Sequence, residues 1–453
     1  MYYTLKKDSL KEWAGLLCFS VLFIFNAFIQ HESIAFAFYH INNLLYITII
    51  LFLYNYKSSY FYIVCALYFV CFHQYSSDPY SESFFNFLSG YYKLIVYGLF
   101  LLKFKGSLKL STGFIVALIL LYSTFIQFFF VGNSSLQYFF TDVMIYLPAL
   151  AYLFAFKSRT LTKQVVDKTL YLLFKFTLFI PFICFCIYNL DLHTVLYGSY
   201  YFFYGHTISF LLFYSTVYFF VNRDKLKLTK YFPLVLFNVI ILIQSMQSAY
   251  VVILFTFLLY LALLKGSFKS SFTMVVLLFI LFVAGINALP GTWFALKVNQ
   301  ILSLVDIGLN NLELIPSLYV RVYSLLNIIM TNNIYEMCFG RGLGATYIDF
   351  YGAFNSEILH AASFPLEEVR TGNFHLIHET FVKELFHVGI LGFILINLFW
   401  LKKLLATDNI EYIFVFIFTA FLWLSSVQIT FFLGIIVLLM SQQFNNRNDI
   451  NGS

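Results

Sequence analysis

Charged side chains are scarce in this chain of 453 residues. Asp, Glu, Lys and Arg together make up 11% of it, whereas about 25% is usual in a soluble domain. Hydrophobic residues make up 61% and aromatic residues 22%. Apolar runs of about 20 residues, the length that crosses a bilayer as a helix, recur from end to end. The composition therefore excludes a set of ordinary soluble domains and predicts one all-α, polytopic integral membrane domain over residues 1–453.

Cysteine is also scarce, and its placement argues against a disulfide framework. Of the 6 cysteines, only Cys338 falls in a segment that we expect outside the membrane. Cys184 and Cys186 are one residue apart in an expected helix, a spacing typical of apolar packing rather than of a metal site. The basic residues form no continuous patch, so the net charge of +6 does not indicate nucleic-acid binding.

Fourteen apolar segments are candidate membrane spans. Two are short for a hydrocarbon layer about 30 Å thick, and the last two are barely separated, so we expect about 12–14 spanning helices. The first segment follows three lysines and has full spanning length without a small-residue cleavage site, so we interpret it as a span rather than as a cleavable signal. The candidates are residues 13–30, 34–54, 60–73, 84–102, 113–131, 136–156, 169–188, 203–221, 231–244, 249–264, 272–289, 381–401, 410–424 and 427–441.

The distribution of lysine and arginine predicts the orientation. If alternate connections are cytoplasmic, they collect 20 of the 27 basic residues, and the opposite connections hold none before residue 297. Cytoplasmic loops of membrane proteins are enriched in these residues, so both termini are expected in the cytoplasm.

One connection is far longer than the others. The chain spends about residues 290–380 on the side where basic residues are otherwise absent, and loops of this length are usually functional or disordered. The sequence after Pro316 carries apolar residues at positions 318, 322, 325, 326 and 329, which would share one helical face. We expect an amphipathic helix that lies on the membrane surface or packs over the spans.

Arginine in this loop runs against the usual charge bias. Most basic residues on the outer side lie here, among them Arg321, Arg341 and Arg370. The planar fork of donors on arginine suits phosphate groups, and Arg341 lies in the glycine-rich sequence F-G-R-G-L-G, whose backbone N–H groups could also approach an anion. The alternative is pairing with nearby acids, which is strongest for Arg370 because it follows Glu367 and Glu368.

The loop ends in a segment crowded with titratable groups, G-N-F-H-L-I-H-E-T-F-V-K-E-L-F-H-V-G at residues 372–389. We expect His375, His378 and Glu379 at the membrane–water boundary, where histidine can accept a proton near neutral pH. The alternative, polar residues without chemistry, fits His387 best because it enters the span. A metalloprotease motif would need histidine at position 382, and a zinc site would need ligands beyond His375 and His378, so we expect no metal.

The sequence H-E-T-F-V-K-E-L-F-H-V-G-I-L-G resembles the signature of O-antigen ligases and Wzy-type O-antigen polymerases. That signature is a histidine, a polar residue, nine further residues, a glycine, two residues and often a second glycine. It falls here on His378, Glu379, Gly389 and Gly392. The family commonly has Asn, Ser or Gln after the histidine, and glutamate at this position favours polymerase over ligase.

The upstream sequence is similar to the family's arginine, amphipathic helix and glycine-rich turn, here Arg321, Gly340, Gly342 and Gly344. The family often carries a further arginine at an outer turn, where this chain has Gln247 instead. The resemblance therefore implies that another cation holds the lipid diphosphate, and we expect Arg341 first and Arg370 second.

The resemblance implies a GT-C-like fold and inverting glycosyl transfer, independent of metal and cofactor, at the periplasmic face of the bacterial inner membrane. A repeat unit on undecaprenyl diphosphate would be the substrate. His378 would accept the proton of the attacking hydroxyl, and Arg321 would stabilise the departing diphosphate. Glu379, His375 and Gln247 would complete the substrate site. Membrane lipids, a chain-length regulator and a flippase are the implied partners.

Two other functions fit parts of the pattern. A ligase of the same family would transfer the glycan to lipid A core, and a flippase would move the lipid-linked unit across the membrane. A flippase would favour short loops and charges within the spans, whereas this chain gathers most of its unusual polar groups in one long loop. Polymerisation of O-antigen or capsular polysaccharide is therefore the function that the sequence predicts.

Overall fold

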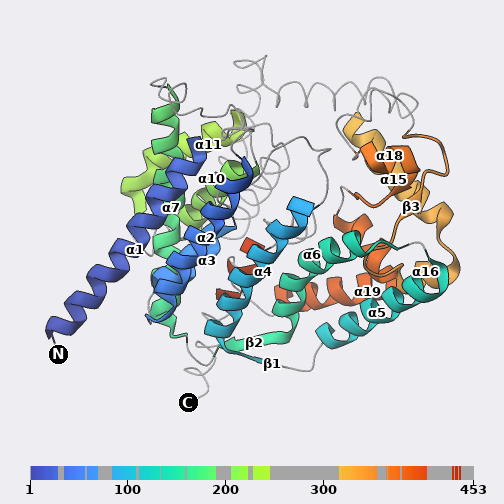
Figure 1. The fold of residues 1–453 in the computed structure, drawn as a ribbon, viewed down its shortest axis with the longest axis horizontal. Coiled ribbons are helices and arrows are strands. Elements are labelled where there is room, and N and C mark those ends of the chain that lie inside the picture. Colours follow the sequence, from blue (N-terminus) through green and yellow to red (C-terminus); the bar gives the residue numbers. More distant parts are fainter. Residues whose placement is uncertain are drawn as a thin grey trace, which may run out of the picture.

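The computed structural model of the protein is predominantly helical (Figure 1). Helices make up 85% of the described residues, which confirms the helical class, although four short strands were not expected. The structure describes residues 2–28, 35–56, 59–69, 84–108, 112–132, 134–158, 161–189, 206–222, 228–244, 316–354, 364, 366–377, 380–405, 431–432, 434–436 and 438–439.

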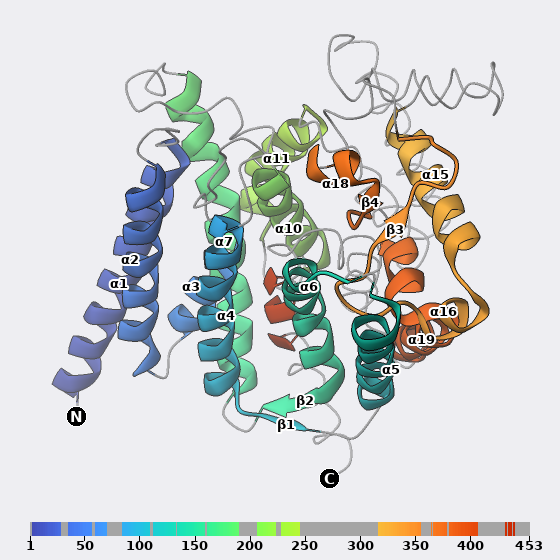
Figure 2. The same ribbon diagram turned by 45° about the vertical axis from the view of Figure 1, so that its right-hand side comes forward.

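A helical bundle forms the left-hand part of Figure 1 and extends to the centre of Figure 2. Each of its helices overlaps a candidate span, because a helix satisfies its own backbone hydrogen bonds along an apolar run. The helices of the bundle are α1 (Tyr2–Phe28), α2 (Ala35–Tyr54), α3 (Ser59–Tyr68), α4 (Phe84–Phe104), α7 (Lys163–Asn189), α10 (His206–Asn222) and α11 (Phe232–Gln244), which follows the 3-10 turn η3 (Leu228–Tyr231).

The bundle has one large apolar core rich in aromatic rings. Fully buried Phe19 and Tyr46 pack with ring centroids 5.1 Å apart, across α1 and α2. Phe431, from near the C-terminus, stacks on Phe69 at 5.0 Å. Segments from both ends of the chain therefore share this core.

Three further helices lie beside the bundle. They are α5 (Thr112–Ile126), which continues into the π-helix η2 (Gln127–Val131), α6 (Leu136–Phe154) and α19 (Thr380–Leu405). Strands β1 (Gly106–Leu108) and β2 (Ala155–Ser158) pair antiparallel, with Gly106 opposite Ser158, and so join the ends of α4 and α6.

A second, smaller core lies at the opposite end of α6 from β2 (Figure 1). We call the described part of residues 316–377 the cap. It contains α15 (Pro316–Thr331), α16 (Ile334–Phe339), β3 (Tyr347–Ile348), α18 (Leu366–Thr371) and β4 (Asn373–Phe374), with Tyr347 of β3 paired with Phe374 of β4. Val382 and Phe386 of α19 complete its core.

The helix expected after Pro316 is confirmed, and the side of it that packs into the cap is not the predicted apolar face, whose placement on a membrane surface stays a prediction. The side that the structure buries carries Val320, Ser324, Asn327 and Ile328, whereas Ile329 is 43% exposed. Ser324 and Asn327 are buried because they bond Tyr347 and Asp349 of the cap.

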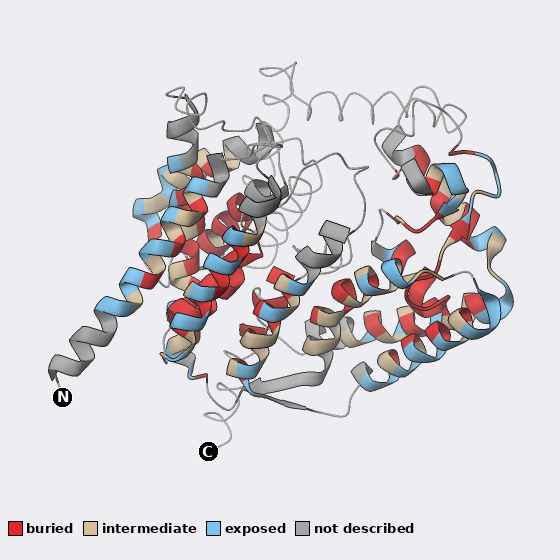
Figure 3. Cartoon of the chain, viewed as in Figure 1, coloured by how far each residue is buried: buried red, intermediate tan, exposed pale blue. Residues whose placement is uncertain are grey.

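Two helical segments in the described part of the chain are long and apolar enough to cross a membrane, Phe114–Val131 and Phe381–Phe399. Figure 3 shows exposed residues along the outer side of α5 and buried residues where α5, α6 and α19 face one another. The candidate spans at 249–264, 272–289 and 410–424 lie outside the described residues, and 427–441 is described only in part.

Candidate functional site

A polar face of α6 forms the centre of the candidate site. Tyr138, Asp142 and Tyr146 follow at four-residue spacing, so they lie one above the other on the same side of the helix. Lys383 and His387 have the same spacing on α19. Together with His375, these residues form what we call the Asp142 cluster.

The carboxylate of Asp142 is fully buried and surrounded by donors. Its Oδ2 atom accepts from the backbone N–H of Gly344 at 2.8 Å and lies 3.1 Å from His375 Nε2. The Lys383 Nζ atom lies 3.8 Å from Oδ1, and His387 Nδ1 lies 3.6 Å from Oδ2. All three of these side chains are themselves buried. A buried charge is stable only when it is paired in this way.

The tyrosines of α6 hold the two histidine rings. Tyr138 stacks on His375 with ring centroids 4.2 Å apart and planes 2° from parallel. Tyr146 stacks on His387 at 5.4 Å and 25°. Each ring is therefore fixed by a neighbour on the helix that also carries Asp142.

Glu368 of α18 fixes the segment that carries His375. Its carboxylate accepts from the backbone N–H groups of His375 and Leu376 and from the Tyr138 hydroxyl. Burial raises the pKa of the Glu368 carboxyl, although His375 and these hydrogen bonds oppose the rise. The main chain and the ring of His375 are thus held by α18 and α6 together.

The glycine-rich turn packs against a break in α19. At Gly389 the backbone leaves the helical region, with φ 64° and ψ −174°, a combination that only glycine readily adopts. The break frees carbonyls that would bond four residues ahead in a helix. The N–H of Arg341 bonds the Phe386 carbonyl at 2.7 Å, and the N–H of Gly342 bonds the His387 carbonyl at 3.0 Å.

Gly340 meets Gly389 at this junction. A Cβ atom on Gly389 would lie 2.4 Å from the Cys338 carbonyl oxygen and from the Gly340 nitrogen, and one on Gly340 would lie 2.3 Å from the His387 backbone. A Cβ atom on Gly342 would lie 2.2 Å from the Thr124 nitrogen of α5, and one on Gly344 would lie 2.8 Å from the Phe139 Cβ of α6. The residue Gly392 lies one turn beyond the break and crowds only its own Val388. The motif glycines thus allow backbones to approach.

The guanidinium of Arg341 binds groups of the protein itself. This does not favour the diphosphate-binding role that we expected for it. Its guanidinium donates to the carbonyls of Thr346 at 2.8 Å and Thr331 at 2.7 Å, and Nε lies 3.4 Å from Glu336. Burial lowers the pKa of Arg341, and Glu336 opposes that change. The N–H groups of the turn are likewise occupied, and the anion that Gly344 binds is the carboxylate of Asp142.

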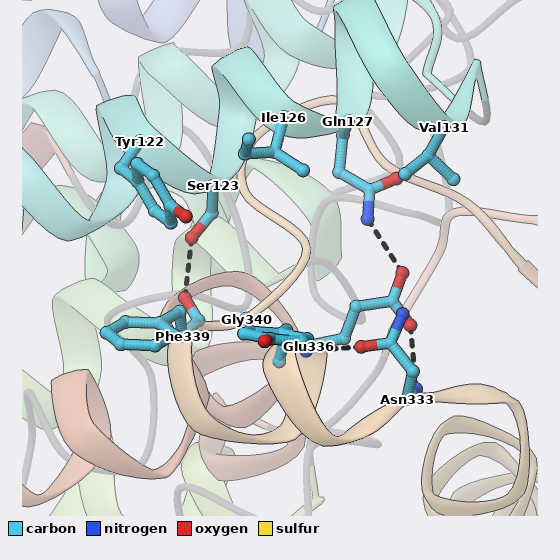
Figure 4. Close-up of a pocket in the computed structure, with 10 residues that line it drawn as sticks. Tyr122, Ser123, Ile126, Gln127, Val131, Asn333, Glu336, Phe339 and Gly340 are labelled. Carbon is cyan, nitrogen blue, oxygen red and sulfur yellow. Dashed lines mark hydrogen bonds between the residues drawn. The ribbon is translucent and has the colours of Figure 1, made fainter.

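A pocket of about 400 Å³ lies on the other side of the turn, between α5, η2 and α16. Figure 4 shows Gln127 pointing toward Glu336 and Ser123 pointing toward the Phe339 carbonyl. These hydrogen bonds measure 2.8 and 2.7 Å. Glu336 also forms a capping box with Asn333 at the start of α16. The hydrogen bonds from Gln127 and Ser123 therefore hold α16 against α5 and the π-helix.

Asp142, His375 and His387 offer donor atoms that all lie within 4.8 Å of one another, a spacing compatible with a metal ion. The ammonium of Lys383 already pairs with the carboxylate, however, and the Gly344 N–H donates a hydrogen bond to it. A divalent cation would face that fixed positive charge, so the geometry favours an internal network of charges.

The structure separates the predicted site residues into three groups. His375 lies in the Asp142 cluster, and the glycines at 340, 342, 344 and 389 form the junction beside it. Arg321 on α15 and Arg370 on α18 are exposed, and no ion pair of Arg370 is present among the described residues. His378, Glu379 and Gln247 lie outside the described residues, so their roles stay predictions.

From the sequence, we did not expect Asp142 or Lys383 in the site, and we interpreted His387 as a structural residue. A signal was present for Asp142, because a lone carboxylate in an apolar run such as F-F-T-D-V-M-I-Y-L needs a partner. The partners could not be identified, because they follow more than 200 residues later.

No family model, curated protein or solved structure matches this chain.

Proposed function

We propose that this protein is a polytopic membrane glycosyltransferase that polymerises oligosaccharide repeat units carried on undecaprenyl diphosphate. One observation carries the proposal. The two sequence motifs that resemble O-antigen polymerases, around Gly340 and around Gly389, meet backbone to backbone and adjoin one buried polar cluster. Motifs almost 50 residues apart therefore contribute to the same site.

Exposed apolar surface supports the membrane part of the proposal. Leu118, Leu121 and Phe125 on the outer side of α5 are 48%, 67% and 52% exposed, and Phe129 and Phe130 of η2 are each 73% exposed. Contiguous apolar faces of this kind are rare on soluble monomers. We infer that they contact lipid and that the chain has about 12–14 spans.

The placement of basic residues supports the orientation. Lys103, Lys105 and Lys157 lie at or beside the β1–β2 ribbon, at the end of the molecule opposite the cap (Figure 1). Because lysine is enriched on the cytoplasmic side, the ribbon would face the cytoplasm and the cap the periplasm of a bacterial inner membrane. The glycan substrate would then be bound beneath the cap.

The proposed reaction needs a base and a cation. The acceptor hydroxyl loses its proton to His378 while its oxygen bonds the anomeric carbon. The bond from that carbon to the diphosphate oxygen breaks, and its electron pair leaves with the diphosphate. Arg321 stabilises the leaving group. Because Arg341 is committed to the cap, Arg370 becomes the second candidate for binding the diphosphate, and Glu379 and Gln247 remain candidates for substrate binding.

The proposal is tested by replacing the base in a strain that lacks the natural gene. We expect His378→Ala, inserted at the normal level, to lower chain formation about 10²–10⁴-fold and to leave glycolipids that carry a single repeat unit. His40→Ala is the matched control, because His40 bonds Tyr92 on α4 at 2.8 Å within the bundle. We expect it to leave long chains unchanged.

Other products would overturn the proposal. Long chains made by His378→Ala would exclude His378 as the base. In the strain without the gene, bare lipid A core with accumulated lipid-linked polymer would indicate a ligase. Lipid-linked single units retained on the cytoplasmic side would indicate a flippase.

A further inference from the structure

Contacts to both its ring and its backbone hold His375 in place. Its ring lies flat on Tyr138, its backbone N–H bonds Glu368, and its Nε2 atom faces Asp142. The side chain is nevertheless not completely buried, since 7% of its surface remains exposed. Helix α6, through Tyr138 and Asp142, and helix α18, through Glu368, therefore fix one imidazole at the edge of the cluster.

The surroundings of Asp142 determine the protonation of that ring. Lys383 and the Gly344 N–H stabilise an ionised carboxylate, and an ionised carboxylate can only accept hydrogen bonds. His375 must therefore carry a proton on Nε2 to make the contact of 3.1 Å. In the neutral ring, the other nitrogen, Nδ1, is then an acceptor without a proton.

We propose that Asp142 is a positioning residue that locks His375 as a hydrogen-bond acceptor for a sugar hydroxyl of the glycan. This inference rests on the proposed function, since it names the part of the substrate that the cluster recognises. A neutral acceptor selects a donor, and hydroxyl groups are the donors that every sugar offers. Because no proton is transferred, His375 contributes to binding and leaves the chemistry to His378.

The expected kinetic signature is a change in KM rather than in kcat. The substrate is lipid-linked single units extracted from the strain that lacks the gene, presented to purified protein in lipid nanodiscs. We expect His375→Ala to raise KM about tenfold with kcat nearly unchanged, which corresponds to the loss of one hydrogen bond. His375→Asn should recover part of the loss, because its carbonyl oxygen can take the place of Nδ1.

The effect of Asp142 on the tautomer of His375 is measured from the nitrogen signals of the His375 ring. With ¹⁵N-labelled histidine, we expect His375 to give the signals of a ring protonated at Nε2 alone, assigned by their absence from His375→Ala. Asp142→Asn should produce a mixture of tautomers and a KM several-fold higher. Asp167→Asn, an exposed acid on α7, is the matched control and should change neither quantity.

A double variant distinguishes the effect of Asp142 on the His375 ring from its effect on the charge balance with Lys383. If Asp142→Asn does not fold because Lys383 loses its partner, the double variant Asp142→Asn/Lys383→Gln removes both charges and should restore a folded protein. That protein should still show mixed tautomers of His375. The ring signals do not depend on enzymatic activity, so failure of the proposed function and failure of this inference can be distinguished.

Three outcomes would overturn the inference. One is an unchanged tautomer of His375 in both Asp142 variants. Another is a fall in kcat at constant KM in His375→Ala, because His375 would then act in the chemical step. The third is tight, stoichiometric binding of Zn²⁺ that His387→Ala abolishes, because the cluster would then be a metal site.

Discussion

The bundle and the cap of this protein use opposite means to pack their elements together. The bundle core consists mainly of apolar and aromatic side chains, with a few buried polar groups such as Asn43 and Asn238 bonded within it, and apolar contacts depend on volume more than on direction. The cap and α19 are joined by backbone contacts at Gly340 and Gly389 and by the buried charges of the Asp142 cluster. The bundle should therefore tolerate substitution, and the junction should not.

We expect the largest difference in stability between the alanine variants of two glycines. Gly389→Ala places a methyl group 2.4 Å from backbone atoms in a conformation suited to glycine alone, so we expect a loss of at least about 3 kcal/mol and little folded protein. Gly98→Ala in α4 meets no atom within 4 Å and should be neutral or stabilising by about 0.5–1 kcal/mol. Thermal unfolding of the purified variants in detergent measures both, and equal tolerance would contradict the comparison.

Two buried lysines offer the next comparison. Lys383→Met leaves the Asp142 carboxylate buried without its ammonium, which should cost about 3–5 kcal/mol. Lys93 of α4 is also buried, but the described residues include no ion-pair partner for it, so Lys93→Met should be neutral or stabilising. The same unfolding measurement applies. A more damaging effect of Lys93→Met would show that the bundle, too, depends on a charge pair.

Arg341 and Arg370 distinguish a structural arginine from an exposed one. Arg341→Lys cannot reach two carbonyls and Glu336 with a single ammonium, so we expect a loss of about 1–3 kcal/mol. Arg370→Lys on the surface of α18 should change stability by less than about 0.5 kcal/mol. If Arg370 binds the diphosphate, its lysine variant should instead raise KM. A stable Arg341→Lys protein with a raised KM would reverse the two assignments.

The smallest expected effect concerns pH. The pKa of Glu368 is raised in the folded cap, so its contribution to stability is fully present below the unfolded pKa. That contribution is lost as pH rises through the folded pKa. After correction for the intrinsic pH dependence of exchange, the protection of the α18–β4 segment from hydrogen exchange should therefore fall over that interval in the natural protein. Glu368→Gln should flatten the dependence, while the protection within the bundle stays constant in both proteins.

The sequence allowed the helices to be predicted because apolar runs and helix length are local properties. The side of α15 that packs into the cap could not be predicted, because apolar periodicity takes no account of polar residues, and Ser324 and Asn327 are buried by hydrogen bonds to Tyr347 and Asp349. The resemblance identified the important glycines, but nothing in one sequence indicates that Gly340 and Gly389 touch.

From the sequence, we predicted only those residues of the candidate site that lie late in the chain. The histidines and glycines near residue 380 lie in one short motif, whereas Asp142 belongs to a helix 233 residues earlier than His375. A contact between such distant residues leaves no local pattern. The expected role of Arg341 changed for a similar reason, because its partners Thr331 and Thr346 flank it in a turn whose shape depends on α5 and α19.

The separation of Asp142 and His375 in the sequence also determines when they can meet during biosynthesis. After Asp142, the ribosome adds 233 residues before it has made His375, which takes about 10–50 s at the usual rates of translation. During that interval the growing chain carries an acidic side chain whose eventual partners do not yet exist. A chain that terminates before residue 375 never acquires them, so prematurely ended products should be substrates for quality-control proteases even when the whole N-terminal bundle has been made.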